Sequence, residues 1–420
     1  MQIALVGCGG MGLRHAYGYI EMRKYFDSFH LAAVCDLHES TANHLASEVE
    51  NATGARPKVY TDLARMLDEE QSLDAVDIVT DTRMHHTFAQ MAFDAGLHVM
   101  TEKPLGLTVR ACQLMRSAAE NSGRTLSVAE NYRRDPMNRL TRALLDAGVI
   151  GTPQFMIKIG VSGGSALMHN TGWRALKSRA GSIILEQGVH DADLMLYFLG
   201  DVHSVYAATG LFTRVRRRDP INPRLAQFYS HRVEEEFAGD STVELDQEDT
   251  AFAVLRFSSG AVGQYGITNA SHGHSVGVDT VHGSLGTIEM PPSRSGQTPT
   301  VHIEGQAMPL TGEQLLAAVP DWELDDIASR FWEGERRIAS YQMPFEAIDR
   351  KLIGIEYEEF ADAIRTGRQP EVDADMGMKA LALAYATLES GMVHQPVFMT
   401  DMLEGTVDAY QREVNESAGL

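Results

Sequence analysis

The start of the chain constrains its fold more than any other stretch does. Residues 2–6 form an apolar run typical of a buried strand, and Gly7-Cys8-Gly9-Gly10-Met11-Gly12 follows at once. A helical pattern at 13–25 comes next, and then a second apolar run at 30–35 that ends at Asp36. Strand, glycine turn, helix, strand and acid in this order are typical of a dinucleotide-binding βαβ unit. The glycines alone would also fit a turn in another fold.

Each glycine in this unit has a separate expected role. Gly7 would form the tight turn, Gly9 would let the backbone approach a diphosphate, and Gly12 would let the helix pack closely on the strand. The diphosphate would rest on the free N–H groups of the helix N-terminus. The predicted contacts of the turn are therefore Gly7, Gly9, Gly10, Met11 and Gly12.

Asp36 indicates which dinucleotide is bound. It stands 24 residues beyond Gly12 (36 − 12), near the place where a carboxylate accepts hydrogen bonds from the adenosine ribose hydroxyls. The same carboxylate repels a 2′-phosphate, and Leu37 and His38 follow it without an arginine to neutralise one. We therefore expect NAD rather than NADP.

The alternation of strands and helices continues to about residue 130. Short apolar runs separated by helical patterns are typical of a doubly wound parallel sheet. We expect helices at 61–69, 85–95 and 108–121, and strands at 75–80, 97–100 and 124–129.

A different pattern follows, which predicts a second domain. Strand-like runs occur at 154–161, 203–209, 250–257, 261–269 and 287–290 with few helices between them. This pattern predicts an α+β domain with a large, open, mainly antiparallel sheet, and the boundaries 1–130 and 131–420. We expect helices at 140–147, 182–199, 321–341, 352–365 and 376–391, and an exposed polar excursion at 214–239 for which a functional basic patch is the alternative.

Charge and cysteine usage limit the possible partners and compartment. A net charge of -21 argues against nucleic acid and anionic membranes as partners. Cys8, Cys35 and Cys112 lack CxxC spacing, so neither a disulfide framework nor a zinc site is expected. With no signal peptide or membrane-length apolar run, we expect a cytoplasmic protein.

Two stretches carry residues suited to catalysis. Lys103 follows a predicted buried strand, so it would lie at the carboxyl end of a parallel sheet, where open α/β folds bind ligands. Glu186 and His190 are four residues apart on a predicted helix and share one face, and Asp193 follows. A carboxylate beside a histidine suits general acid/base work. A solvated lysine and a structural Glu–His pair are the alternatives.

These motifs resemble those of the Gfo/Idh/MocA family of nicotinamide-dependent oxidoreductases. The resemblance covers most of the chain, in family order, but not the polar excursions or the region 305–350. The matching pieces are Gly7–Gly12, 77–80 leading to His85, Gly96 to Pro104, Asn131-Tyr132-Arg133-Arg134, Trp173-Arg174, Glu186 to Asp193, and 260–263.

The resemblance implies a Rossmann domain followed by an α/β domain, and oxidation or reduction of a carbinol carbon on a sugar or cyclitol. It implies that His190 is the general base or acid, and that Lys103 hydrogen-bonds the same substrate oxygen. Glu186 stands at the family's usual aspartate position and would support the proton transfer. Arg133 and Trp173 match substrate-side positions, although structural packing explains either equally well.

The resemblance also implies cofactor contacts beyond the glycine turn. These are Thr80, Asp81, His85, Glu102 and Lys103. Asp81 replaces the family's common proline, and Glu186 is one methylene longer than aspartate, so both departures weaken any inference about the exact substrate. The resemblance further suggests that the Lys103–Pro104 bond is cis.

The leading hypothesis is thus an NAD-dependent dehydrogenase of a sugar or cyclitol that forms a homodimer or homotetramer. One alternative is an NAD-dependent glycoside hydrolase that acts through a transient ketone. Another is a non-catalytic nucleotide sensor. No metal site is expected, because His272 and His274 lack a third ligand.

Overall fold

The computed structural model describes residues 1–219, 223–231 and 241–420. The first part of the chain forms a sheet of six parallel strands in the order β3-β2-β1-β4-β5-β6. This order confirms the predicted doubly wound sheet. Its strands are β1 (Gln2–Val6), β2 (His30–Cys35), β3 (Lys58–Tyr60), β4 (Ala75–Ile78), β5 (His98–Glu102) and β6 (Leu126–Ala129).

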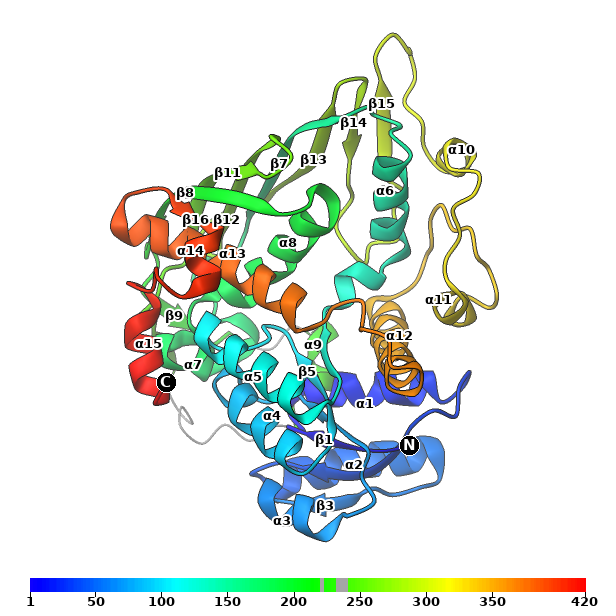
Figure 1. Ribbon diagram of the computed structural model, residues 1–420, viewed down its shortest axis with the longest axis vertical. Coiled ribbons are helices and arrows are strands. Elements are labelled where there is room, and N and C mark those ends of the chain that lie inside the picture. Colours follow the sequence, from blue (N-terminus) through cyan, green and yellow to red (C-terminus); the bar gives the residue numbers. More distant parts are fainter. Residues whose placement is uncertain (220–222, 232–240) are drawn as a thin grey trace.

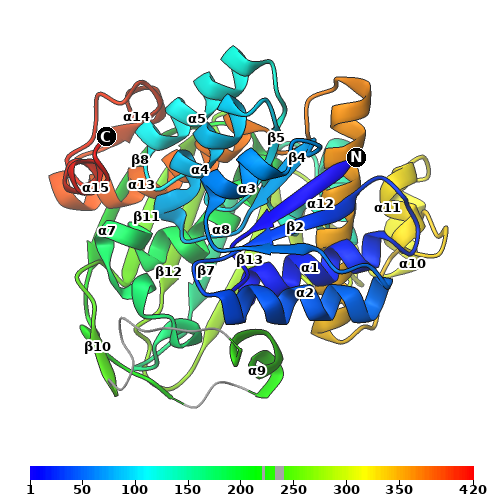
Figure 2. The same cartoon turned by 90° about the horizontal axis from the view of Figure 1, so that it is seen from below.

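Helices cover both faces of this sheet (Figure 2). On one face lie α1 (Gly10–Met22) and α2 (Glu39–Thr53), and on the other lie α3 (Leu63–Glu69), α4 (His85–Asp94) and α5 (Val109–Ser122). Helix α1 begins within the glycine turn, three residues earlier than its apolar pattern predicts. Helix α2 and strand β3 are not predicted from the sequence, since α2 is largely polar and β3 is only three residues long.

The second sheet has eight strands in the order β15-β14-β13-β7-β12-β11-β8-β16. Only β7 and β12 run parallel, so the prediction of a mainly antiparallel sheet is confirmed. The strands are β7 (Pro153–Val161), β8 (Val202–Gly210), β11 (Thr250–Phe257), β12 (Val262–Thr268), β13 (Val276–Gly283), β14 (Gly286–Glu289), β15 (Thr300–Ile303) and β16 (Val397–Phe398).

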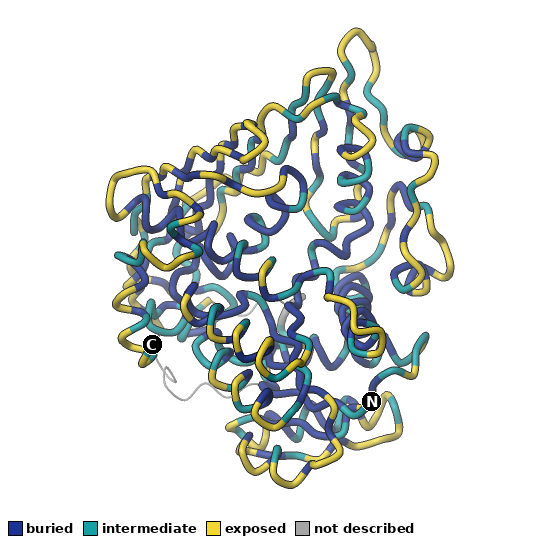
Figure 3. The backbone as a smooth tube through the Cα atoms, in the orientation of Figure 1, coloured by how far each residue is buried: buried dark blue, intermediate teal, exposed yellow. Residues whose placement is uncertain are grey.

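One face of the second sheet is covered and the other is open (Figures 1 and 3). Helices α8 (Ile183–Leu199) and α13 (Ala374–Val393) pack on the inner face. The alternation along β11 shows the two environments, because Leu255 is fully buried whereas Phe252 and Val254 are 44% and 52% exposed.

A late helix returns to the first sheet and joins the two halves. Helix α12 (Phe345–Thr366) crosses α1 (Figures 1 and 2) in close contact, so that a Cβ on Gly18 would lie 2.4 Å from the side chain of Ile353. Leu352 and Phe360 share a hydrophobic core with α1. Packing therefore crosses residue 130, and that domain boundary stays a prediction. The remaining terminal helices are α14 (Met399–Glu404) and α15 (Gln411–Ala418).

The predicted helix at 321–341 is wrong for most of its length. Only α11 (Asp326–Phe331) is helical there, preceded by α10 (Glu313–Ala318). The chain turns at Glu333 and Gly334, which both have positive φ. Arg337 then donates to the carbonyl oxygen of Leu316 in α10 and to that of Pro320 in the following loop, so its charge stabilises a turn rather than a helix face.

The excursion predicted at 214–239 is exposed in part and buried in part where the structure describes it. Strands β9 (Val215–Arg217) and β10 (Thr242–Glu244) pair, and Arg216 lies buried against Asp249 at 2.9 Å. The side chains of Phe228 and Tyr229, at the end of α9 (Pro223–Tyr229), are also buried. The run of three arginines therefore overlaps strand β9, and the middle residue of that strand, Arg216, is buried. Glu234-Glu235-Glu236 lies outside the described residues.

Among the described residues, no helix combines the length and the apolar character that crossing a membrane requires.

Candidate active site

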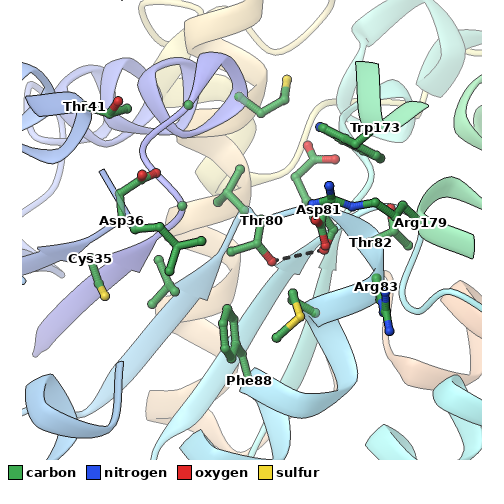
Figure 4. A pocket seen from close by; sticks show the side chains of 18 of the residues that line it. Cys35, Asp36, Thr41, Thr80, Asp81, Thr82, Arg83, Phe88, Trp173 and Arg179 are labelled. Carbon is green, nitrogen blue, oxygen red and sulfur yellow. Dashed lines mark hydrogen bonds and ion pairs between the residues drawn. The ribbon is translucent and has the colours of Figure 1, made fainter. Parts of the chain in front are cut away.

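A cleft of about 850 Å³ lies between the carboxyl ends of the first sheet and a segment of the second half (Figure 4). Its lining includes Asp36, which follows β2, and also Lys103 and Glu186. The predicted site residues that line it are Gly7, Gly9, Gly10, Met11, Asp36, Thr80, Asp81, Glu102, Lys103, Trp173 and Glu186.

The glycine turn has the geometry of a diphosphate cradle. Gly7 has φ +99°, which disfavours side chains, and a Cβ on Gly12 would lie 1.9 Å from the carbonyl oxygen of Gly7. A Cβ on Gly9 would meet no atom of the described residues within 4 Å, so among these residues the space above it is open at the start of α1. The free N–H groups of that helix can therefore face an anion.

The ribose end of the cleft fits an adenosine. Asp36 is fixed by accepting hydrogen bonds from the backbone N–H groups of Cys8 (2.7 Å) and His38 (2.9 Å). Nearby, the hydroxyl of Thr41 is buried at the cleft and has no hydrogen-bond partner within the described chain. Together with the glycine cradle, this polar end fits a bound dinucleotide.

Tyr229 is a cleft residue that the sequence does not reveal. A Cβ on Gly10 would lie 2.2 Å from the Tyr229 ring, so the end of α9 packs directly on the glycine turn. His169 stacks on the same ring with centroids 5.2 Å apart. No local signal near residue 229 points to this contact, because it depends on the tertiary fold.

The loop after β4 is held from the opposite domain. Asp81 forms an ion pair with Arg179 of α7 (Lys177–Ala180), and both line the cleft (Figure 4). The second carboxylate oxygen of Asp81 is buried without a hydrogen-bond partner among the described residues. The residue that replaces the family's proline thus forms an interdomain contact.

His85 supports the cleft from behind rather than lining it. Its Nδ1 lies 3.0 Å from the carbonyl oxygen of Pro104, and its Nε2 lies 3.4 Å from that of Thr80. The ring therefore bridges the loops after β4 and β5. The Lys103–Pro104 bond is cis, as the resemblance suggests.

Glu102 is embedded in a buried network. His15 of α1 lies between two carboxylates, with Nδ1 2.8 Å from Asp77 and Nε2 3.3 Å from Glu102. Burial acts to lower the pKa of His15, but these carboxylates raise it to about 10. Burial acts to raise the pKa of Glu102, but the hydrogen bond from His15 and the charge of Lys103 lower it. The pair is therefore ionic at neutral pH.

Lys103 connects the first sheet to helix α8. Its Nζ donates a hydrogen bond to the backbone carbonyl of Glu186 at 3.0 Å. An ammonium group has three N–H donors, so two have no partner among the described residues and remain for a ligand. The lysine predicted from its place at a strand end thus lies where the two halves of the chain meet.

Glu186 is occupied by partners other than His190. One carboxylate oxygen accepts a hydrogen bond from Thr82 at 3.1 Å, and the other pairs with Arg174 at 3.1 Å. Burial acts to raise the pKa of Glu186, but the charges of Arg174 and Lys103 lower it. This carboxylate is therefore ionised.

The carboxylate that contacts His190 is Glu130, which is not among the predicted site residues. His190 Nδ1 lies 2.7 Å from both carboxylate oxygens of Glu130. Burial, followed by the charges of Lys103 and Arg294, lowers the pKa of His190 well below its usual value. Burial raises the pKa of Glu130 to about 7. The expected pairing of His190 with Glu186 is therefore replaced by another, because the side chain of Glu186 is held by Arg174 and Thr82.

Arg133 and Asp193 form a buried pair of their own. Nε and Nη2 of Arg133 each donate a hydrogen bond to a carboxylate oxygen of Asp193, at 2.6 and 2.8 Å. The guanidinium group of Arg133 also lies over the ring of Tyr197. Within the described residues, the lining of the cleft includes neither Arg133 nor His190. This geometry favours the structural interpretation of Arg133, while Trp173 lines the cleft beneath Arg174.

The other histidines give no metal centre. His272 lies with its Nε2 3.1 Å from the hydroxyl of Thr213. Among the described residues, no group of three or more His, Cys, Asp or Glu side chains is arranged to hold a metal ion.

Comparison with known proteins assigns the family. Residues 1–130 match the Gfo/Idh/MocA oxidoreductase family with its NAD-binding Rossmann fold, and residues 142–398 match that family's C-terminal alpha/beta domain. The chain therefore belongs to the Gfo/Idh/MocA oxidoreductase family, and its first sheet is the family's NAD-binding domain.

Individual relatives share most of the chain's length. A D-apiose dehydrogenase of Paraburkholderia graminis is 29% identical over 395 residues, which are 91% of this chain and 86% of the relative. An inositol 2-dehydrogenase of Saccharopolyspora erythraea is 29% identical over 309 residues, which are 73% of this chain and 78% of the relative. The structure of a levoglucosan dehydrogenase with NADH and L-sorbose has a TM-score of 0.74 at 22% identity, covering 96% of this chain and 99% of that one.

Proposed function

We propose that this protein is an NAD-dependent dehydrogenase that oxidises a carbinol carbon of a sugar or cyclitol. The observation that carries the proposal is the continuous cleft from Asp36 and the glycine turn to Lys103 and Glu186. The names of the relatives, which include dehydrogenases of D-apiose and of inositol, support this substrate class.

Gly7, Gly9, Gly10, Met11, Gly12 and Asp36 would hold the dinucleotide, with Thr80, Asp81 and Glu102 farther along the same cleft. NAD, when bound, supplies the hydride acceptor. The carboxylate of Asp36 favours NAD over NADP, since it would repel a 2′-phosphate.

Lys103 and His190 would act on the substrate oxygen. Loss of hydride from carbon requires the hydroxyl proton to leave in step, and His190 is the base. Lys103 keeps two N–H donors that can stabilise negative charge developing on that oxygen. Glu186, held ionised beside Lys103, can accept a hydrogen bond from a neighbouring hydroxyl.

A panel of sugars and polyols tests the proposal, with NAD and NADP in parallel and NADH formation followed by absorbance. We expect turnover of at least one sugar or cyclitol, with NAD preferred. Binding of NAD without any absorbance change would favour a nucleotide sensor. Glycoside cleavage without net NADH formation would favour the hydrolase alternative.

We also propose that the open face of the second sheet pairs with a second copy of the chain. Exposed apolar side chains on this face lie opposite one another on neighbouring strands. Tyr206 of β8 is paired with Val254 of β11, and Phe155 of β7 is paired with Val262 of β12. A patch of this kind favours self-association into a homodimer or homotetramer. Light scattering should give a multiple of 46.2 kDa, and Val254→Lys should reduce that mass. A monomer mass for the unmodified protein would refute the proposal.

A further inference from the structure

A buried carboxylate lies directly behind the proposed base. We propose that Glu130 is the positioning residue of His190, and that it takes up the proton which His190 passes on from the substrate. The proposal rests on the dehydrogenase function proposed above, and it assigns a role to a residue outside the motifs that suggested that function.

The geometry holds the imidazole ring in one orientation. Both oxygens of Glu130 lie 2.7 Å from Nδ1, and Oε1 also accepts the backbone N–H of Tyr132 at 3.1 Å. The ring of Tyr132 stacks on the imidazole with centroids 4.1 Å apart and planes 4° apart. Arg294 in turn donates to the Tyr132 hydroxyl at 3.1 Å and lies over its ring.

This arrangement selects the tautomer of His190. An ionised carboxylate can only accept hydrogen bonds, so Nδ1 carries the proton and Nε2 carries the free electron pair. Glu130 engages only Nδ1, which leaves Nε2 to exchange a proton with a substrate. The side chain of His190 keeps 16% of its surface exposed, whereas that of Glu130 keeps 3%. The carboxylate is therefore shielded behind the ring.

Charges around the pair favour the carboxylate as the final holder of the proton. The cations Lys103 and Arg294 oppose a charged imidazole, as does burial. Burial also gives Glu130 a pKa of about 7, so this carboxyl group can hold a proton near neutral pH. The charged groups that act on the pair are Lys103, Glu102, Arg133, Asp191, Arg294 and Glu356.

The proposed step balances in protons and electrons. The substrate O–H bond breaks and its proton binds His190 Nε2, while the Nδ1 proton moves to a Glu130 oxygen. NAD, when bound, would supply the acceptor for the hydride of the same carbinol carbon, which would become a carbonyl. The imidazole is neutral before and after, and the released proton ends on Glu130.

The first test needs neither cofactor nor substrate. Diethyl pyrocarbonate reacts with an unprotonated imidazole nitrogen, and mass spectrometry of the peptide carrying His190 follows its rate against pH. In the unmodified protein we expect the rate to rise with a midpoint near pH 7, because Nε2 becomes free as the pair loses its proton. In Glu130→Gln the midpoint should fall by roughly one pH unit or more, since the proton is then bound by a histidine whose own pKa is lowered.

The second test measures turnover. Glu130→Gln should lower kcat about 100-fold, the scale of general-base catalysis, with KM changed less than about threefold because Glu130 lies behind the ring. Glu389→Gln is the matched control. Glu389 is also fully buried, accepts the backbone N–H of Tyr410 at 2.7 Å and has a raised pKa, but it lies in the contact between α13 and α15. We expect its kcat to be unchanged.

Several results would overturn the proposal. One is an equal midpoint of His190 modification in Glu130→Gln and the unmodified protein. Another is a kcat within a few-fold of the unmodified protein. If Glu130→Gln fails to fold, the unmodified protein alone still tests the proposal. A midpoint of its His190 modification rate below about pH 5.5 would contradict the proposal, because His190 would then titrate without the help of Glu130. Absence of turnover on every sugar would contradict the dehydrogenase function alone, since the modification experiment is independent of it.

Discussion

Two buried glutamates differ in their relation to the proposed base: Glu130 contacts His190, whereas Glu186 lies four residues before it on α8, and their surroundings give them opposite properties. Glu186, on α8, pairs with Arg174 and has a lowered pKa. Glu130, after β6, pairs with His190 and has a pKa raised to about 7. Both are almost fully buried, at 4% and 2% exposed. The difference therefore comes from the partner and not from burial.

This comparison assigns the two carboxylates to different tasks. A carboxylate that stays ionised suits the binding of hydroxyl groups, whereas one that titrates near neutral pH suits proton transfer. The sequence spacing favours Glu186 as the partner of His190, because residues four apart share a helix face. The structure shows that the contact instead joins two segments 60 residues apart.

Removal of Lys103 should have the largest effect, because its charge acts on both glutamates. We expect Lys103→Ala to lower kcat about 1,000-fold, the upper range for loss of one group that stabilises an oxyanion. Binding of NAD, measured by calorimetry, should change little in comparison. Full turnover by this variant would exclude the proposed role of Lys103.

Replacement of Glu186 should have a smaller effect on a different parameter. Glu186→Gln keeps the shape but removes the charge that faces Arg174, so we expect kcat/KM to fall about 10- to 100-fold, with KM raised. The pH at which kcat/KM is half-maximal should stay near that of the unmodified protein. A fall in kcat with unchanged KM would mean that Glu186 acts in proton transfer.

Loss of Arg174 should make Glu186 resemble Glu130. Without that cation the pKa of Glu186 should rise, because burial is the opposing influence. We expect Arg174→Met to lower kcat/KM about 10-fold at pH 6 and less at pH 8. Arg179→Met is the matched comparison, since Arg179 pairs with Asp81, and it should not add this pH dependence. Equal losses at both pH values in Arg174→Met would show that Glu186 stays ionised without Arg174.

The cleft residues that follow the strands of the first sheet were predictable because each is local in sequence. The glycine turn, Asp36 and Lys103 all follow buried parallel strands, and the carboxyl ends of such strands meet at one edge. The same rule applies to Glu130, which follows β6 directly and could have been found by it. The strand-end position was thus a better guide than the helical spacing of Glu186 and His190.

The contacts that the sequence does not reveal join distant segments. Tyr229 packs on Gly10, Arg179 pairs with Asp81, and α12 covers α1, each across more than 90 residues. Such contacts depend on how the second half folds back on the first, and neither local periodicity nor composition encodes this. The helix predicted at 321–341 is wrong because the chain turns at Glu333 and Gly334 and Arg337 donates to the carbonyl oxygen of Pro320 in the preceding loop.

The most direct test of the contrast between the two glutamates is the pH dependence of kcat/KM for oxidation. It is measured side by side in the unmodified protein, Glu130→Gln and Glu186→Gln. Oxidation requires the deprotonated Glu130–His190 pair, so kcat/KM should rise with pH through about 7 in the unmodified protein. The midpoint should stay there in Glu186→Gln and move to lower pH in Glu130→Gln. A midpoint that moves in Glu186→Gln and stays in Glu130→Gln would contradict the assignment.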